Sequence, residues 1–371
     1  MDRGGRVDLG LVIPLAMLLA IGTVVIYSSS STLTQQARFG YDSTYFLHRH
    51  LFKLLIGLSA LMLTLKLDYR WFRRFTPWVL LISLILLALA IILKRGRWFR
   101  MGFLSFQPSE LAKFSIVLYL AGFLERKKRV MEESGRGLLP PLLVVGTVFI
   151  FIAVEPDFST ATVILGLAGI MLFVGGARIR HLLAIGLFSL PLLYFFIRWA
   201  PYRMERFKVY LHPLQDTRGL GFQLHQSLIS LGSGGLLGTG IGEGKGKLFF
   251  LPQPHTDFIL SSIGEELGFL GTGIVLLLFL IFLLRGIRAS ARAPDLYGSF
   301  LGLGLTVMIG VGFLLNVGVA CGRLPTTGLP LPFISYGGSS LLFCLMGSGI
   351  ILQLSKRGIA RRFPRFPREE G

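Results

Sequence analysis

Apolar runs of about 20 residues alternate with short polar stretches along almost the whole chain. Since a helix of about 20 apolar residues spans a bilayer, this pattern predicts ten transmembrane segments. It therefore indicates an all-α polytopic membrane protein with about ten transmembrane helices, organised as a single integral membrane domain over residues 1–371. The expected segments are 8–28, 48–67, 75–94, 108–124, 138–155, 158–175, 181–199, 257–285, 297–321 and 334–354.

One connection is much longer than the others. Roughly 57 residues separate the seventh and eighth apolar segments, so residues 200–256 form a large loop. A connection of this length within a compact fold usually carries function. Loop 200–256 is therefore the first region in which we expect a functional site.

Composition supports the membrane assignment. Hydrophobic residues make up 53% of the chain and charged residues only 15%, and the mean hydropathy is +0.68. The net charge of +19 comes from basic residues clustered between apolar runs, where they set topology and meet lipid headgroups. We therefore expect no nucleic-acid binding.

The basic residues also predict an orientation, because Lys and Arg are enriched in cytoplasmic loops. With the N-terminus inside, 22 of the 38 Lys and Arg residues lie on the inner side, 14 lie on the outer side, and two lie within segments. This orientation places loop 200–256 on the outer, extracytoplasmic side.

Loop 200–256 is rich in glycine, but its glycines do not form a nucleotide-binding motif. Lys245 and Lys247 lack both the first glycine and the following hydroxyl residue of a Walker A loop, and no window has the dinucleotide-binding spacing. We expect no nucleotide. The glycines are compatible with flexible or close-packed backbone, and equally with a backbone cradle for an anionic ligand.

Basic side chains give the loop a cationic face. Such a face is either ordinary solvated surface or a binding site for a lipid-linked pyrophosphate, because Arg and Lys bind phosphate oxygens through charge-assisted hydrogen bonds. The residues concerned are Arg203, Arg206, Lys208, Arg218, Lys245 and Lys247.

Asp257 opens the eighth segment. If that helix crosses the bilayer and ends near Arg285, Asp257 lies about 12 Å beyond the hydrocarbon, among the headgroups. On a continuous helix, Asp257, Gly264, Gly268 and Gly271 would share one face, which permits close packing or a cavity. Asp257 is therefore expected either to cap the helix or to act as a functional carboxylate.

Other ionisable residues lie near the ends of apolar segments, where charge is costly and usually paired or functional. Glu110 and Lys113 are three residues apart in QPSELAK and predict an ion pair. Glu155 and Asp157 lie in the turn EPDFST, expected on the outer side. Asp157 is interpreted as a helix cap, with a divalent cation as the alternative.

Several stretches carry a family resemblance. PYRMERFKVYLHP, GFQLHQSLISLGSGGLLGTGIG, FLPQPHTDFILSSIGEELGFLG and GRLPTTGLPLPFISYGGSS, together with QPSELAK, are similar to the SEDS family of RodA and FtsW proteins. The resemblance covers nearly the whole chain, and the HTDF and PLPFISYGGSS motifs are highly specific. It implies a bacterial inner-membrane peptidoglycan glycosyltransferase that polymerises lipid II, with a class B penicillin-binding protein transpeptidase as partner. The LPQPHTDF context favours the RodA branch, which acts in cell-wall elongation.

The resemblance also implies roles for particular residues. A sugar hydroxyl is a poor nucleophile, so a carboxylate should accept its proton, and Asp257 is the candidate general base. The leaving pyrophosphate needs positive charge, from basic residues or from a bound Mg²⁺ or Mn²⁺ ion held by Asp157 or Asp257. The expected substrate-binding residues are Arg203, Arg206, Lys245, Lys247 and His255.

Two other functions remain open from the sequence. Charged residues within spans would also suit a transporter that flips lipid II across the membrane. The chain could equally be a non-catalytic scaffold for the class B penicillin-binding protein. Polymer formation from supplied lipid II distinguishes an enzyme from both.

Overall fold

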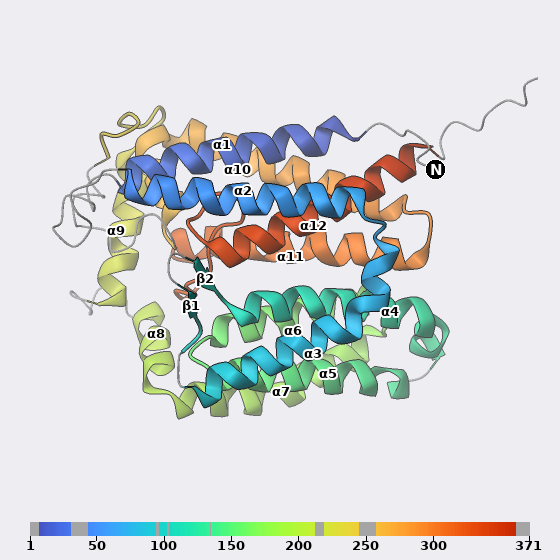
Figure 1. Cartoon of the computed structure of the whole chain (residues 1–371). Coiled ribbons are helices and arrows are strands. Elements are labelled where there is room, and N and C mark those ends of the chain that lie inside the picture. The colour runs from blue at the N-terminus through green and yellow to red at the C-terminus, as the bar shows by residue number, and fades with distance from the viewer. Residues whose placement is uncertain are drawn as a thin grey trace, which may run out of the picture.

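The computed structural model describes residues 7–30, 44–93, 96–101, 104–133, 135–211, 219–244 and 257–360. Within these ranges the regular secondary structure is helical apart from one pair of short strands (Figure 1). The helices are α1 Leu9–Ser30, α2 Tyr45–Lys66, α3 Arg70–Ile92, α4 Pro108–Glu133, α5 Leu139–Val154, α6 Phe158–Val174, α7 Ile179–Trp199, α8 Pro201–Leu211, α9 Leu220–Ser233, α10 Ile259–Ala291, α11 Leu296–Ala320 and α12 Gly338–Ala360, with a short 3-10 helix at Gly135–Leu138. Strands β1 Phe99–Met101 and β2 Leu104–Phe106 pair antiparallel.

These helices confirm the polytopic all-α fold. In the described ranges, α1, α2, α3, α7, α10, α11 and α12 are long and apolar enough to cross a membrane, and α5 and α6 are shorter apolar helices. With the 26-residue α4, they correspond one to one to the ten expected segments. Most helix ends differ from the expected ones by only a few residues, because charged and glycine residues at the ends of apolar runs mark where helices stop.

The long helices lie side by side with their axes roughly aligned (Figure 1). Helix α12 packs on α2, α10 packs on both α1 and α11, and α4 packs on both α3 and α11. The hairpin, α8 and α9 lie together at one end of the bundle (Figure 1), which we call the α8/α9 end. Helix α1 begins at the opposite end (Figure 1).

Apolar side chains divide between the interior and the lipid-facing surface. The ring pair Phe279 and Phe313 stacks in the core with centroids 4.3 Å apart. By contrast, Phe188 on α7 is 83% exposed and Trp78 on α3 is 63% exposed. Large apolar side chains on the outside are stable only against lipid, so the exposed surface supports the membrane assignment.

The expected continuous face of small residues along the eighth segment is wrong. The backbone of α10 breaks at Gly268, which has φ +68° and ψ −165°. The segment after α9 hydrogen-bonds to the helix at this break: Phe269 N donates to Gly235 O at 2.9 Å, and Gly240 N donates to Glu266 O at 3.1 Å. Only glycine adopts this backbone conformation without strain.

Two described glycines of loop 200–256, Gly234 and Gly238, permit close packing against α10. A side chain at Gly234 or Gly238 would overlap the backbone of α10 at Gly264 or Glu266. Glu266 itself is buried, and its carboxylate accepts a hydrogen bond from Ser28 on α1. The first part of the loop is therefore packed against α10, while residues 245–256 lie outside the described part.

Candidate functional site

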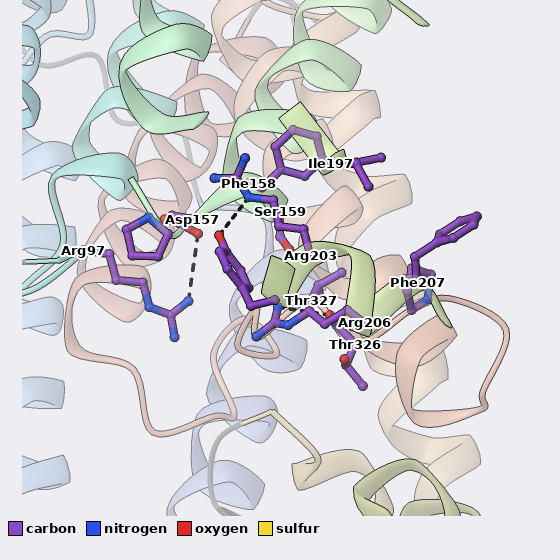
Figure 2. A pocket seen from close by; sticks show the side chains of 13 residues that line it. Arg97, Asp157, Phe158, Ser159, Ile197, Arg203, Arg206, Phe207, Thr326 and Thr327 are labelled. Atoms are coloured by element: carbon purple, nitrogen blue, oxygen red, sulfur yellow. Dashed lines mark hydrogen bonds and ion pairs between the residues drawn. The ribbon is translucent and has the colours of Figure 1, made fainter. Parts of the chain in front are cut away.

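A cavity of about 120 Å³ opens at the α8/α9 end (Figure 2). It lies between the residues before β1, the α5–α6 turn, α8 and the α11–α12 connection. We call it the site cavity. Its polar and aromatic lining includes Arg97, Asp157, Tyr202, Arg203, Arg206 and Thr326.

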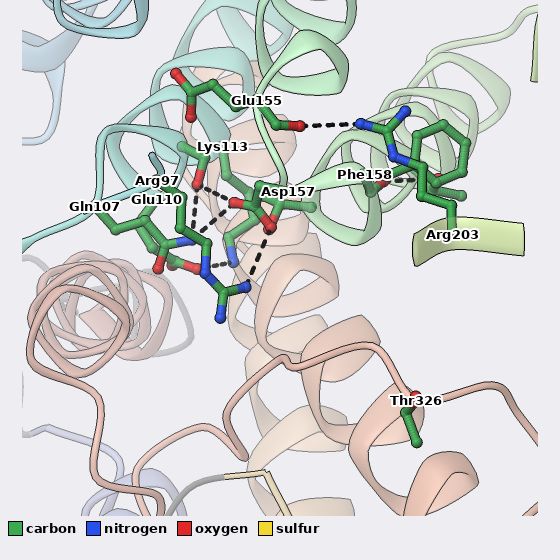
Figure 3. Close-up of polar contacts among 12 residues, drawn as sticks. Arg97, Gln107, Glu110, Lys113, Glu155, Asp157, Phe158, Arg203 and Thr326 are labelled. Carbon is green, nitrogen blue, oxygen red and sulfur yellow. Dashed lines mark hydrogen bonds and ion pairs between the residues drawn. The ribbon is translucent and has the colours of Figure 1, made fainter. Parts of the chain in front are cut away.

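Asp157 is a buried carboxylate with three close donors. Its side chain is 1% exposed. Oδ2 accepts hydrogen bonds from Ser109 Oγ at 2.6 Å and Gln107 Nε2 at 2.8 Å, and Oδ1 accepts one from Thr160 Oγ1 at 2.8 Å (Figure 3). Arg97 Nη1 lies 4.0 Å from Oδ1. These bonds offset the cost of burying the charge.

Two alternatives for Asp157 can be compared with this geometry. Asp157 occupies the N-cap position of α6, but its side chain makes no capping hydrogen bond, so the expectation that it caps the helix is wrong. Among the residues the structure describes, no three His, Cys, Asp or Glu side chains lie close enough together to hold a metal ion. The divalent cation suggested by the sequence stays a prediction.

The expected ion pair is present at the start of α4. Lys113 Nζ donates to Glu110 Oε1 at 2.9 Å, and the two side chains are 10% and 2% exposed. Both side chains lie close to Asp157 and the side chains that donate hydrogen bonds to it (Figure 3). Loss of either partner would leave a buried charge unpaired, which is strongly destabilising.

Arg203 joins α8 to the rest of the bundle. Its guanidinium donates to three backbone carbonyls, those of Ala153, Glu155 at 3.1 Å and Phe196 at 2.9 Å. It also lies over the Phe158 ring, 4.9 Å from the centroid (Figure 3). These bonds place α8 against the α5–α6 turn. A direct contact between Arg203 and substrate stays a prediction.

Arg206 lies one turn further along α8 and makes fewer hydrogen bonds to described residues than Arg203 does. Its Nη1 donates to Thr326 O at 3.2 Å, and the side chain is partly buried. The charge of Asp257 acts on it, as does that of Arg97. Arg206 therefore brings a positive charge towards both the site cavity and Asp257.

Asp257 lies in the turn immediately before α10. The N-cap residue of α10 is Phe258, without a side-chain capping bond, so Asp257 does not cap the helix. Its carbonyl accepts from Asn316 Nδ2 at 3.0 Å, and the same amide donates to Leu329 O at 3.0 Å. Asn316 thus holds the start of α10 against the α11–α12 connection.

The Asp257 carboxylate and the Arg97 guanidinium both approach Gly328. A methyl group built on Gly328, which has φ +71°, would lie 3.7 Å from Asp257 Oδ2 and 3.6 Å from Arg97 Nη1. Burial raises the pKa of Asp257, and the positive charges of Arg97 and Arg206 partly oppose that rise. A carboxylate whose pKa is raised is a better proton acceptor near neutral pH.

Glu155 is the other perturbed acid in this region. It is 3% exposed, and neither carboxylate oxygen has a hydrogen-bond partner among the described residues. Burial, reinforced by the charge of Asp157, raises its pKa to about 8. Glu155 is therefore protonated at neutral pH, while its backbone carbonyl binds Arg203.

The structure thus brings Arg206, Asp257 and Asp157 to one end of the bundle. Lys245, Lys247 and His255 lie outside the described residues. Sequence reasoning missed Arg97, Asn316 and Gly328. Asn316 is the single amide side chain in the apolar run 301–320, which made it recognisable from the sequence. No local sequence pattern distinguished Arg97 or Gly328 from their neighbours.

Comparisons with known proteins agree with this architecture. A family model described as "Cell cycle protein" (FTSW_RODA_SPOVE) matches residues 9–358. Stage V sporulation protein E of Bacillus subtilis (strain 168) is 41% identical over 356 residues, covering 94% of this chain and 97% of the relative. A probable peptidoglycan glycosyltransferase FtsW of Geobacter metallireducens is 39% identical over 359 residues, 95% of each chain.

Solved structures show the same fold. The rod shape determining protein RodA of Thermus thermophilus has a TM-score of 0.68 and 30% identity, covering 95% of this chain and 97% of that one. A chain from a structure titled "Structural coordination of polymerization and crosslinking by a peptidoglycan synthase complex" has a TM-score of 0.76 and 33% identity, covering 95% and 98%. The chain belongs to the SEDS family of FtsW, RodA and SpoVE proteins. Because its relatives carry all three names, the elongation branch stays a prediction.

The raised pKa of Glu155 predicts how stability depends on pH. Between pH about 4.5 and about 8 the unfolded chain has lost this proton while the folded chain keeps it, so stability falls as pH rises. Glu155→Gln places an uncharged side chain at this position, as protonated Glu155 does. The variant should therefore lack this loss of stability with rising pH. We expect the melting temperature of Glu155→Gln to match wild type at pH 5 and to exceed it by about 3 °C or more at pH 8.5.

The matched control is Glu205→Gln on α8, because Glu205 is exposed. This control should leave the pH dependence of the melting temperature unchanged. Identical melting curves for Glu155→Gln and wild type across this pH range would contradict the burial of a protonated Glu155.

Proposed function

We propose that this protein is a peptidoglycan glycosyltransferase that polymerises lipid II into glycan strands, with Asp257 as general base. The main support is the position of Asp257 at the start of α10, where burial raises its pKa and the charges of Arg97 and Arg206 act on it. The relatives named peptidoglycan glycosyltransferase and the likeness to a chain of a peptidoglycan synthase complex point in the same direction.

In the proposed reaction, the sugar hydroxyl of one lipid-linked substrate attacks the anomeric carbon of another. The hydroxyl proton passes to the Asp257 carboxylate as the new C–O bond forms. The bond between the anomeric carbon and the pyrophosphate oxygen breaks with its electron pair leaving on the pyrophosphate, so the configuration inverts. Arg206 and Arg97 supply positive charge where negative charge grows on the leaving group.

We further propose that the α8/α9 end faces the extracytoplasmic side of the bacterial inner membrane. The distribution of Lys and Arg supports this orientation, with 22 residues expected inside and 14 outside. Lipids in one bilayer leaflet would reach the site cavity laterally, which lowers the entropic cost of aligning two substrates. A class B penicillin-binding protein is the proposed cross-linking partner.

The Asp257 role predicts the behaviour of an isosteric variant. Asp257→Asn keeps the size of the side chain and the Asn316 hydrogen bond to its carbonyl, but it cannot accept a proton. With lipid II supplied in detergent, strand formation by purified Asp257→Asn should fall by about 10²–10⁴-fold, with a melting temperature near that of wild type. Gel analysis of labelled strands measures the loss.

The control for this experiment is Asp8→Asn, because Asp8 pairs with Arg285 at the opposite end of the bundle. Strand formation by Asp257→Asn at the wild-type rate would exclude the base role. Transbilayer movement of lipid II by wild-type protein, with no polymer, would indicate a flippase. A partner complex whose activity is unaffected by Asp257→Asn would indicate a scaffold.

Two neighbouring arginines on α8 should respond differently to truncation. Arg206→Ala removes a cation near Asp257 and one hydrogen bond to Thr326 O, so polymerisation should fall about tenfold or more with little change in stability. Arg203→Ala leaves three backbone carbonyls without their donor, so unfolding should become easier by about 2–4 kcal/mol. Wild-type kinetics in Arg206→Ala would remove Arg206 from the site.

A further inference from the structure

A second cavity, of about 530 Å³, opens at the opposite end of the bundle. It lies between the start of α3, the later part of α4 and the start of α11, and the proposed glycosyltransferase reaction uses none of its residues. We call it the arginine cavity. Its charged lining consists of Arg70, Arg73, Arg74, Arg126, Glu125 and Asp295.

Two of the four arginines are paired with carboxylates. Arg70 Nη2 lies 3.0 Å from Asp295 Oδ2, and Arg73 Nη1 lies 2.9 Å from Glu125 Oε1. Asp295 also caps α11 by accepting from Gly298 N at 2.7 Å. These acids are therefore neutralised and fixed in place, so they oppose an incoming anion only weakly.

The other two arginines have no carboxylate partner among the described side chains. Arg126 donates its Nε to Gly122 O at 3.0 Å, and within the described part of the chain its two terminal nitrogens make no hydrogen bond. Arg74 is exposed and lines the same cavity. The lining therefore carries two more positive than negative groups, and the excess comes from Arg74 and Arg126.

A buried hydroxyl also lines the arginine cavity. Tyr297 is 1% exposed, and its hydroxyl lies near Thr76 without a hydrogen bond of good geometry to any described residue. Thr76, in the same lining, donates its own hydroxyl to Phe72 O at 2.7 Å. Buried tyrosine hydroxyls normally find a partner, so an acceptor entering the cavity would complete the site.

We propose that the arginine cavity binds a phosphate group, carried by an anionic phospholipid headgroup or by free phosphate. Arg74 and Arg126 hold the phosphate oxygens, and the Tyr297 hydroxyl donates a further hydrogen bond. The planar guanidinium fork matches phosphate oxygens two at a time.

The location of the arginine cavity favours this ligand over a simple solvated basic surface. Arginines that only set membrane topology project separately into water, whereas these converge on one hollow with a buried donor. In the orientation expected from the sequence, this end of the bundle lies at the cytoplasmic leaflet, where anionic lipids are concentrated. Basic pockets between transmembrane helices on that side bind anionic headgroups.

The experiment measures binding, so its outcome is independent of the glycosyltransferase activity. Full-length protein, delipidated in detergent, is titrated by native mass spectrometry with dioleoyl phosphatidylglycerol or dioleoyl phosphatidylcholine. Wild type should bind phosphatidylglycerol about tenfold more tightly. Arg74→Gln combined with Arg126→Gln should abolish that preference, and neither change strands a carboxylate. Tyr297→Phe should weaken phosphatidylglycerol binding a few-fold.

The matched control is Arg288→Gln, because Arg288 is an exposed arginine of α10 outside the arginine cavity. A second arm adds inorganic phosphate or chloride at equal ionic strength and records the melting temperature. If phosphate raises the melting temperature of wild type but not of the double variant, free phosphate is a ligand. If phosphate does not raise it and the preference for phosphatidylglycerol is intact, the lipid headgroup is the ligand. The proposal would be overturned if wild type bound both lipids equally and phosphate left its melting temperature unchanged. It would also be overturned if the double variant behaved like Arg288→Gln.

Discussion

The hydrogen bonds of Arg203 determine the shape of the α8/α9 end. One guanidinium binds backbone carbonyls at the end of α5, in the α5–α6 turn and in α7. It therefore fixes the helix that carries Arg206 to the turn that carries Asp157. Burying an arginine costs free energy unless its N–H groups are hydrogen-bonded. Moving α8 away from the α5–α6 turn would break these bonds, so α8 is held in place.

Three acids in this region have different environments, and their chemistry differs accordingly. Asp157 accepts three side-chain hydrogen bonds, from Gln107, Ser109 and Thr160. Glu155 receives none from the described residues and keeps its proton to about pH 8. For Asp257, burial raises the pKa while the charges of Arg97 and Arg206 oppose the rise. Of the three, Asp257 is the acid best suited to exchange a proton during turnover.

The fold was largely predictable because bilayer thickness fixes the length of an apolar helix. Helices α5 and α6 were recognised from apolar runs that end at Glu155 and at a glycine pair. The break at Gly268 was not predictable, because it depends on hydrogen bonds from a segment some 30 residues earlier in the chain. Likewise, the alternation of polar and apolar residues gave no reason to expect α8 and α9 inside a loop.

The candidate site was only partly predictable. The Glu110–Lys113 pair was found from the sequence because charge is rare at membrane depth. Arg206 was singled out as part of the basic face of loop 200–256 and Asp257 as the acid of the HTDF motif at the start of the eighth segment, and the roles proposed for both stay predictions. Arg97 was counted only as a basic residue that sets orientation, and its charge acts on Asp257 because two connections far apart in the sequence approach each other at Gly328. The roles expected for Lys245, Lys247 and His255 stay predictions.

The central claim is that Asp257 is the proton acceptor and that Arg97 adjusts its pKa. The pH dependence of kcat/KM for lipid II polymerisation, measured for wild type and Arg97→Gln, tests it most directly. In wild type, the acid limb of the pH profile should lie above the ordinary pKa of an aspartate. In Arg97→Gln it should move to higher pH, because a charge that lowers the pKa of Asp257 has been removed. An acid limb that stays at the same pH in Arg97→Gln would contradict the account.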